Sequence, residues 1–104
     1  MNATKPKHYR IEILVQNKKI DLGEKYAYAV EANSQIEWIC KQPFAIQFDW
    51  DAPFELKSKG ANSLLMEMKD DAKPLYPYKY MVAVFFENEV ITDDPIIIRP
   101  PDRG

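Results

Sequence analysis

The carboxylates of this chain gather in three short clusters, and they are its most evident chemical groups. Asp49 and Asp51 flank Trp50, Asp70 precedes Asp71, and Asp93 precedes Asp94. Carboxylate oxygens are preferred ligands of Ca²⁺, so clusters that meet at one end of the fold would form a calcium or small-ligand site. The spacing is not that of an EF-hand. Asp side chains also hydrogen-bond the backbone of tight turns, so a purely structural role explains the same residues.

Two aromatic residues, Trp50 and Phe54, lie in a predicted loop where core packing is less obligatory. Together with Asp49 and Asp51 they would form an anchor patch for a protein partner, since aromatic residues dominate binding hot spots. The alternative is that the loop folds back to close the open end of the fold, which would bury the same rings. We predict Trp50, Phe54, Asp49 and Asp51 as the binding residues.

His8 and Cys40 are the only imidazole and the only thiol in the chain. A blue-copper site needs two imidazoles and a thiolate, and a tetrahedral zinc site needs still more nitrogen or sulfur ligands. A nucleophilic Cys–His pair needs the two groups in contact, whereas Cys40 alternates with apolar residues as a small buried hydrophobe. Paired carboxylates for hydrolysis would need a sugar cleft as well. We predict no catalytic residue, no metal and no cofactor, with a hydrolase as the alternative.

The composition is that of an ordinary globular domain, with 104 residues, 46% hydrophobic and 29% charged. This length suits one domain over residues 1–104, with a flexible arm at 1–7 and a flexible tail at 100–104. With 14 Lys and Arg against 16 Asp and Glu, the chain lacks the concentrated basic surface that nucleic acid requires. The sequence shows no apolar run of membrane-spanning length, no signal peptide and no cysteine pair. We therefore expect a cytoplasmic protein.

Hydrophobic residues alternate with polar ones along most of the chain, which predicts strands and almost no helix. The expected strands span residues 9–15, 26–30, 36–40, 44–48, 64–68, 78–86 and 96–98. Eight prolines and several turn clusters separate them at the spacing typical of a sandwich or barrel. We predict an all-β fold, an antiparallel β-sandwich of seven to eight strands that is cupredoxin-like or immunoglobulin-like. A single cysteine excludes the disulfide of an antibody domain.

From residue 36 onward, a series of strand and turn motifs resembles a known family. The motifs are Ile36-Glu37-Trp38, Pro43-Phe44-Ala45-Ile46-Gln47-Phe48, Pro53-Phe54, Tyr78-Lys79-Tyr80-Met81-Val82-Ala83-Val84 and Asp93-Asp94-Pro95-Ile96-Ile97-Ile98. They are similar to small uncharacterised bacterial β-sandwich proteins, including the DP-EP family, over about the last two-thirds of the chain. The resemblance implies a bacterial sandwich without metal, and it brings no catalytic residues with it.

These observations predict binding or assembly rather than catalysis. The partner would be another protein or a second copy of the chain, and not nucleic acid or a membrane. A second candidate surface is Tyr76 with Phe85, on the outward side of the strand at 78–86, which would suit a dimer contact. The alternative function is a small-ligand or calcium-binding module that uses the Asp-rich loops.

Overall fold

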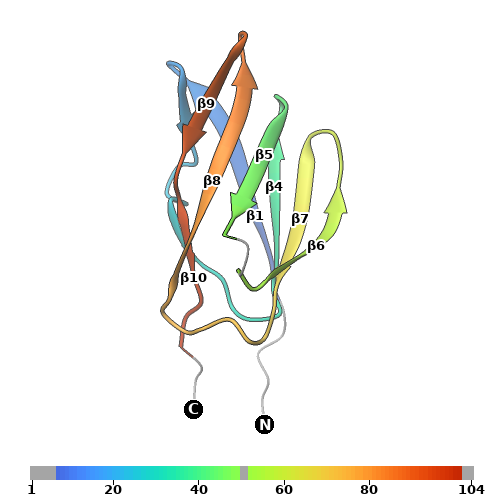
Figure 1. Cartoon of the computed structure of the whole chain (residues 1–104), viewed down its shortest axis with the longest axis vertical. Coiled ribbons are helices and arrows are strands. Elements are labelled where there is room, and N and C mark those ends of the chain that lie inside the picture. The colour runs from blue at the N-terminus through green and yellow to red at the C-terminus, as the bar shows by residue number, and fades with distance from the viewer. Residues whose placement is uncertain (1–6, 50–51, 102–104) are drawn as a thin grey trace.

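A computed structural model describes residues 7–49 and 52–101 of the protein (Figure 1). These ranges contain ten strands: β1 (His8–Gln16), β2 (Lys19–Asp21), β3 (Ala27–Ala29), β4 (Gln35–Cys40), β5 (Phe44–Phe48), β6 (Phe54–Lys59), β7 (Ser63–Met68), β8 (Pro77–Phe86), β9 (Glu89–Asp93) and β10 (Ile96–Ile98). The all-β prediction is confirmed, whereas the count of seven to eight strands is wrong, because β2, β6 and β9 are not among the predicted ones. Nowhere in the described chain is a helix long and apolar enough to span a membrane.

Each unpredicted strand is one half of an antiparallel hairpin, formed by β1 with β2, β6 with β7, and β8 with β9. Two of the turns have positive φ at both central residues, 52° and 61° at Asn17 and Lys18, and 51° and 63° at Glu87 and Asn88. This is type I′ geometry, whose twist matches that of the flanking strands. Neither turn contains the glycine that usually marks it, so the sequence does not reveal these hairpins.

The strands form two sheets, with the orders β2-β1-β4-β7-β6 and β3-β10-β8-β5, and β9 also pairs with β8. Both sheets are mixed, because β1 runs parallel to β4 and β10 runs parallel to β3. The prediction of a purely antiparallel sandwich is wrong in this respect. Alternation reports which face of a strand is buried but not the direction of its neighbour. After β2 the chain crosses to the second sheet to form β3, and it then returns as β4 beside β1.

The two sheets pack face to face, and the buried side chains between them form one cluster. Its fully buried members include Ile11, Ile36, Trp38 and Met68 from the first sheet and Val82, Val84 and Ile97 from the second. These are the inward positions that the alternating pattern predicts. The indole N–H of Trp38 donates a hydrogen bond across the sandwich to the Tyr80 hydroxyl at 3.3 Å, so the polar atom of this large side chain is satisfied.

The two lateral sides of the sandwich differ, and Figure 1 shows the strands that form them. On what we call the closed side, β2 contacts β9 across the two sheets, and Ile20 of β2 is only 5% exposed. On what we call the open side, β5 and β6 are the edge strands of their sheets and do not pair with each other. Leu56 of β6 is 55% exposed there.

Of the predicted flexible arm, residues 1–7, only Lys7 lies in the described ranges, and it contacts residues 31–35, where the chain enters β4. The Lys7 N–H donates to the Ser34 hydroxyl at 3.0 Å, and its carbonyl accepts from the Gln35 N–H at 2.8 Å. Its ammonium group lies 3.0 Å from the Glu31 carboxylate. Residues 1–6 and 102–104 are outside the described ranges, so the tail at 100–104 is described only at its two prolines, which belong to no strand.

Candidate functional site

The predicted binding loop joins β5 to β6, and its two middle residues, Trp50 and Asp51, lie outside the described residues. Asp49 is exposed at the end of β5, and its backbone carbonyl accepts a hydrogen bond from the Ala52 N–H at 3.0 Å. The Ala52 carbonyl accepts in turn from the Phe54 N–H at 2.9 Å. The second half of the loop therefore leads directly back into the sandwich.

Phe54 lies in the core and not on an exposed patch. It is the first residue of β6, and only 9% of it is exposed. Its ring stacks on Phe48 with the centroids 4.2 Å apart and the planes 17° apart, and it meets the edge of Tyr78 at 5.9 Å. This is the position that the alternative interpretation, a loop folded back onto the end of the sandwich, expects. The ring is not available to a partner.

Phe54 belongs to a row of aromatic rings that leads from the core to the surface. Trp38 contacts Phe48 at 6.1 Å between centroids, and Phe48 stacks on Phe54. Phe54 contacts Tyr78, whose ring centroid lies 4.8 Å from that of Tyr76 at the outer end. Each such contact contributes about 0.5–1.5 kcal/mol beyond the burial of area. These successive contacts therefore connect the exposed ring of Tyr76 to the core and help to fix its position.

An exposed pair of residues, Leu75 and Tyr76, lies at the outer end of this row, and we call this pair the loop anchor. Leu75 is 66% exposed and Tyr76 is 50% exposed. Leu75 has a φ of 60°, a left-handed conformation that costs a non-glycine residue about 1–2 kcal/mol. Its N–H donates to the Arg99 carbonyl at 2.7 Å, and Pro74 forms an isolated bridge with the same residue. The Arg99 guanidinium also donates to the Ala72 carbonyl. The segment after β10 therefore holds the strained backbone in place.

A groove of about 490 Å³ lies beside the loop anchor. We call it the end groove, and it is lined by Asp49, Ala52, Pro53, Asp71, Lys73, Tyr76, Pro77, Tyr78 and Lys79. It joins a predicted binding residue, Asp49, to Tyr76, which the sequence assigned to a separate surface with Phe85. Phe85 lies near the other end of β8, about 30 Å along the strand from Tyr76 at the usual rise per residue. Tyr76 and Phe85 therefore do not form one patch.

The end groove carries charges of both signs around its aromatic residues, with Asp49 and Asp71 against Lys73 and Lys79. The Lys73 ammonium lies 5.7 Å from the ring centroid of Tyr76, within the range of a cation–π contact. The backbone N–H of the same lysine donates to the Tyr78 hydroxyl at 2.7 Å. An aromatic centre with a charged rim is the usual anatomy of a protein interface.

The three acidic clusters approach one another only in part. Asp49 and Asp71 line the end groove, and Asp49 lines a neighbouring pocket of about 520 Å³ together with Asp94. Within residues 7–49 and 52–101, no three His, Cys, Asp or Glu side chains lie close enough to hold one metal ion. The Asp93 carboxylate accepts a hydrogen bond from the Asp94 N–H at 2.8 Å, which is a local turn contact.

His8 and Cys40 lie at opposite ends of the β1–β4 pair. His8 is exposed, with Nε2 3.4 Å from the Glu37 carboxylate. Cys40 is buried and free, its Sγ lies 3.5 Å from the side-chain oxygen of Gln42, and burial raises the pKa of its thiol. A raised pKa disfavours the reactive thiolate, so Cys40 has the surroundings of a structural residue.

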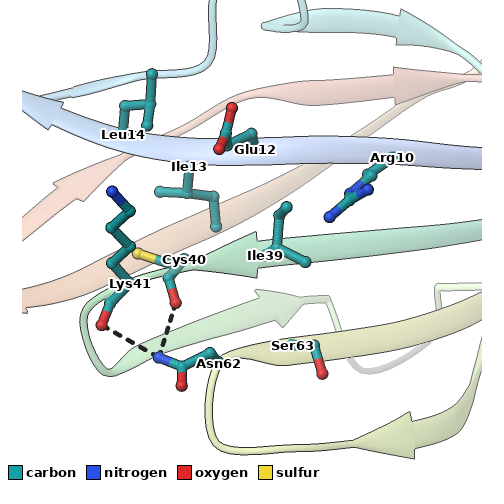
Figure 2. Close-up of a pocket in the computed structure, with 9 residues that line it drawn as sticks. All are labelled: Arg10, Glu12, Ile13, Leu14, Ile39, Cys40, Lys41, Asn62 and Ser63. Carbon is teal, nitrogen blue, oxygen red and sulfur yellow. Dashed lines mark hydrogen bonds between the residues drawn. The ribbon is translucent and has the colours of Figure 1, made fainter.

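A second groove of about 500 Å³, shown in Figure 2, involves β1, β4 and the start of β7. It is lined by Arg10, Glu12, Ile13, Leu14, Ile39, Cys40, Lys41, Asn62 and Ser63. The Asn62 amide donates to the carbonyls of Cys40 and Lys41 at 2.9 and 3.1 Å, which ties the β6–β7 turn to the end of β4. This groove has no aromatic side chain, so we regard the end groove as the stronger binding site.

No protein-family model matches the chain, and no curated protein matches it. The resemblance to the DP-EP family remains a prediction, and the candidate site rests on its geometry.

Sequence reasoning missed Leu75. The available signal is the pair of prolines, Pro74 and Pro77, which flank Leu75 and Tyr76 and are typical of an exposed loop. The left-handed conformation of Leu75 depends on Arg99, which is distant in the sequence, so no local pattern predicts it.

Proposed function

We propose that this protein is a non-catalytic interaction module that binds a protein partner through the end groove and the loop anchor. The observation that supports this best is the exposed pair Leu75 and Tyr76, held on strained backbone at the end of an aromatic row that begins in the core. Strained, exposed backbone persists where the surroundings enforce it, and it is concentrated at ligand-binding sites.

The arrangement suits a partner that inserts an apolar side chain beside Tyr76. The tyrosine is already positioned by Tyr78 and Lys73, so little conformational freedom is lost on binding. Asp49 and Lys79 at the rim would pair with charges of the partner and set its orientation. The predicted binding residues Trp50 and Asp51 lie outside the described residues, so the proposal rests on Asp49 and on the side chains that line the groove with it.

Mixed charge in the end groove favours a polypeptide over the phosphate backbone of a nucleic acid. The proposal contains no catalytic step, metal or cofactor, and the side chains that line the groove include no imidazole or thiol. We also propose a cytoplasmic location, which suits the free thiol of Cys40. Small-ligand or calcium binding by the Asp loops is the alternative function.

We further propose that the sandwich is cupredoxin-like or immunoglobulin-like and related to the DP-EP family. This proposal is supported by the two packed sheets and by the path of the chain, which passes repeatedly from one sheet to the other. The motifs that carry the resemblance fall largely on β4, β5, β8 and β10, which are central to the sandwich or flank its core.

Affinity capture from a lysate of the source cells, with three immobilised forms of the protein, tests the binding function. The forms are the native chain, Tyr76→Ala and the control Phe85→Ala, whose ring is similarly exposed, at 49%. We expect a protein that the native chain and the control retain and Tyr76→Ala loses. Calorimetry with that purified protein should show binding weakened about 30-fold or more by Tyr76→Ala, as for a hot-spot residue.

Retention that is equal on all three forms would contradict the use of the end groove. The calcium alternative has its own measurement, the melting temperature in millimolar calcium against EDTA. A ligand that binds only the native state must raise the melting temperature, so a clear calcium-dependent increase would favour the alternative.

A further inference from the structure

We propose that the free edge of β5 is a self-association site, at which β5 pairs antiparallel with β5 of a second copy of this chain. The proposal goes beyond the binding function above, because it uses the backbone of an edge strand and not the side chains of the end groove.

Strand β5 has hydrogen-bonding groups on its outer edge that the described chain does not pair. It pairs with β8 alone, and the Phe85 N–H donates to the Pro43 carbonyl at 2.9 Å. Backbone groups of successive residues in an antiparallel strand point alternately toward and away from the neighbour. Those of Phe44, Ile46 and Phe48 therefore point away from β8.

The exposure of the side chains agrees with an uncovered edge. Val82 and Val84 of β8 are fully buried, whereas Ile46 and Phe44, which pair with them and face the same core, are only half-buried. The difference arises because β8 has neighbours on both sides and β5 has one.

The other edges of the two sheets carry the protection that natural sheets use against edge-to-edge pairing. Strands β2 and β3 have only three residues each. Strand β6 carries Glu55, Lys57 and Lys59, and its register shifts between Leu56 and Ser58. Strand β9, which pairs with β8 alone, carries Glu89 and Asp93 and contacts β2. The span Phe44–Phe48 has neither a charge nor a proline, so β5 lacks these forms of protection.

A second copy fits this edge because β5 complements itself. In a two-fold pairing centred on Ile46, Phe44 of each copy lies opposite Phe48 of the other, and every outward N–H meets an outward carbonyl. Lys41 precedes β5 and Asp49 follows it, so antiparallel pairing brings the basic end of each strand beside the acidic end of the other. Parallel pairing would place like charges together.

A contact of this size is expected to be weak. Stable complexes bury about 800 Å² on each partner, more than two five-residue strands can cover. The protein should therefore change from monomer to dimer with increasing concentration.

Sedimentation equilibrium of the full chain, from low micromolar to near millimolar concentration, tests the proposal. The variant carries Ala45→Lys with Gln47→Lys, two exposed outward positions that lie opposite each other in the two-fold pairing. We expect association to weaken at least about tenfold because like charges then face each other. Mixing this variant with Ala45→Glu plus Gln47→Glu should restore it. The matched control, Ala27→Lys with Ala29→Lys on exposed positions of edge strand β3, should associate like the native chain.

Cysteine cross-linking tests the register. Ala45 of one copy and Gln47 of the other would form a non-hydrogen-bonded pair, about 4.5 Å between Cα atoms, which suits a disulfide. An equal mixture of Ala45→Cys and Gln47→Cys should therefore give a covalent dimer under mild oxidation. Ala45→Cys alone should give much less, because Ala45 does not face itself.

A strict monomer at every concentration would overturn the proposal, as would equal weakening by the β3 control. If Phe85→Lys abolished association and the β5 variant did not, the contact would lie on the outer face of β8. That result would also overturn the proposal. Tyr76→Ala should leave self-association unchanged. The two proposals can therefore fail independently.

Discussion

On the closed side of the sandwich, β2 contacts β9 across the two sheets, whereas on the open side β5 and β6 do not pair with each other. Ile20 is 5% exposed on the closed side, and Leu56 is 55% exposed on the open side. Each strand of the closed side is the second strand of a hairpin with a type I′ turn. The turns fold these strands back so that they cover the margin of the core.

The comparison shows that the edge of a sheet in a small sandwich can be either covered by another strand or left exposed. A hairpin strand can cover it, as β2 and β9 do, and apolar side chains then become buried. An uncovered edge exposes unpaired backbone hydrogen-bonding groups. Charged residues can then discourage pairing with another chain, as on β6, or a partner strand can pair with the edge, as we propose for β5. The following predictions test how far the two sides differ.

The largest loss of stability is expected at Phe54, the first residue of the open-side strand β6. Phe54→Ala should lower the free energy of unfolding by about 3–5 kcal/mol, because it removes a buried ring that stacks on Phe48. Urea denaturation measures this. Leu56→Ala, two residues further along the same strand and exposed, should cost about 0.5 kcal/mol or less. Similar small losses for both variants would mean that the ring of Phe54 is exposed.

On the closed side, Ile20→Ala should lower the free energy of unfolding by about 2–4 kcal/mol, because it leaves a cavity between β2 and β9. Val90→Ala on β9 is the matched control, since Val90 is 67% exposed. Equal effects of Ile20→Ala and Leu56→Ala would remove the distinction between the two sides.

Tyr80 joins the two sheets through its hydrogen bond with Trp38. Burial raises the pKa of its hydroxyl to about 12. The protonated form is thus favoured in the fold, so the stabilisation is complete below pH 10 and is lost as the pH rises through the folded pKa. The loss should reach about 2–3 kcal/mol. Melting temperatures at rising pH measure it.

The control for this pH dependence is Tyr80→Phe. This variant should be less stable at neutral pH, because the Trp38 N–H loses its acceptor, but its stability should fall less steeply at alkaline pH. An unchanged slope in the variant would assign the alkaline loss to other groups, such as Tyr9, whose pKa is raised by burial and by its hydrogen bond to Glu31.

The smallest effect is expected at the turn that leads into the closed side. Lys18→Gly should stabilise the protein by about 0.5–1 kcal/mol, because glycine adopts positive φ without strain and Asn-Gly is the preferred type I′ pair. The net gain is small because glycine also increases the entropy of the unfolded chain. Thermal melting measures it. A destabilised variant would contradict the assigned turn geometry.

Alternation along the chain was sufficient to identify seven of the ten strands in the described residues and the buried face of most of them. It fails at β2, β6 and β9. The turns that lead into β2 and β9 lack glycine, and all but the first residue of β6 are exposed. The strand predicted at residues 26–30 is shorter in the structure, where β3 spans Ala27–Ala29 and Tyr26 before it is 36% exposed.

The candidate site was predictable only in part. Asp49 and Tyr76 were each singled out, but nothing local to either residue shows that they line one groove. The burial of Phe54 follows from its contacts with Phe48 and Tyr78, which come from two other strands.

The residue types and their order establish the all-β class, the inward face of most strands and the scarcity of imidazole and thiol groups, because these depend on neighbours in the chain. The direction of neighbouring strands, the strained conformation of Leu75 and the uncovered edge of β5 depend instead on residues far apart in the sequence. Hydrogen bonds between distant segments and the packing of the two sheets decide these features. They become visible only when the whole chain is folded.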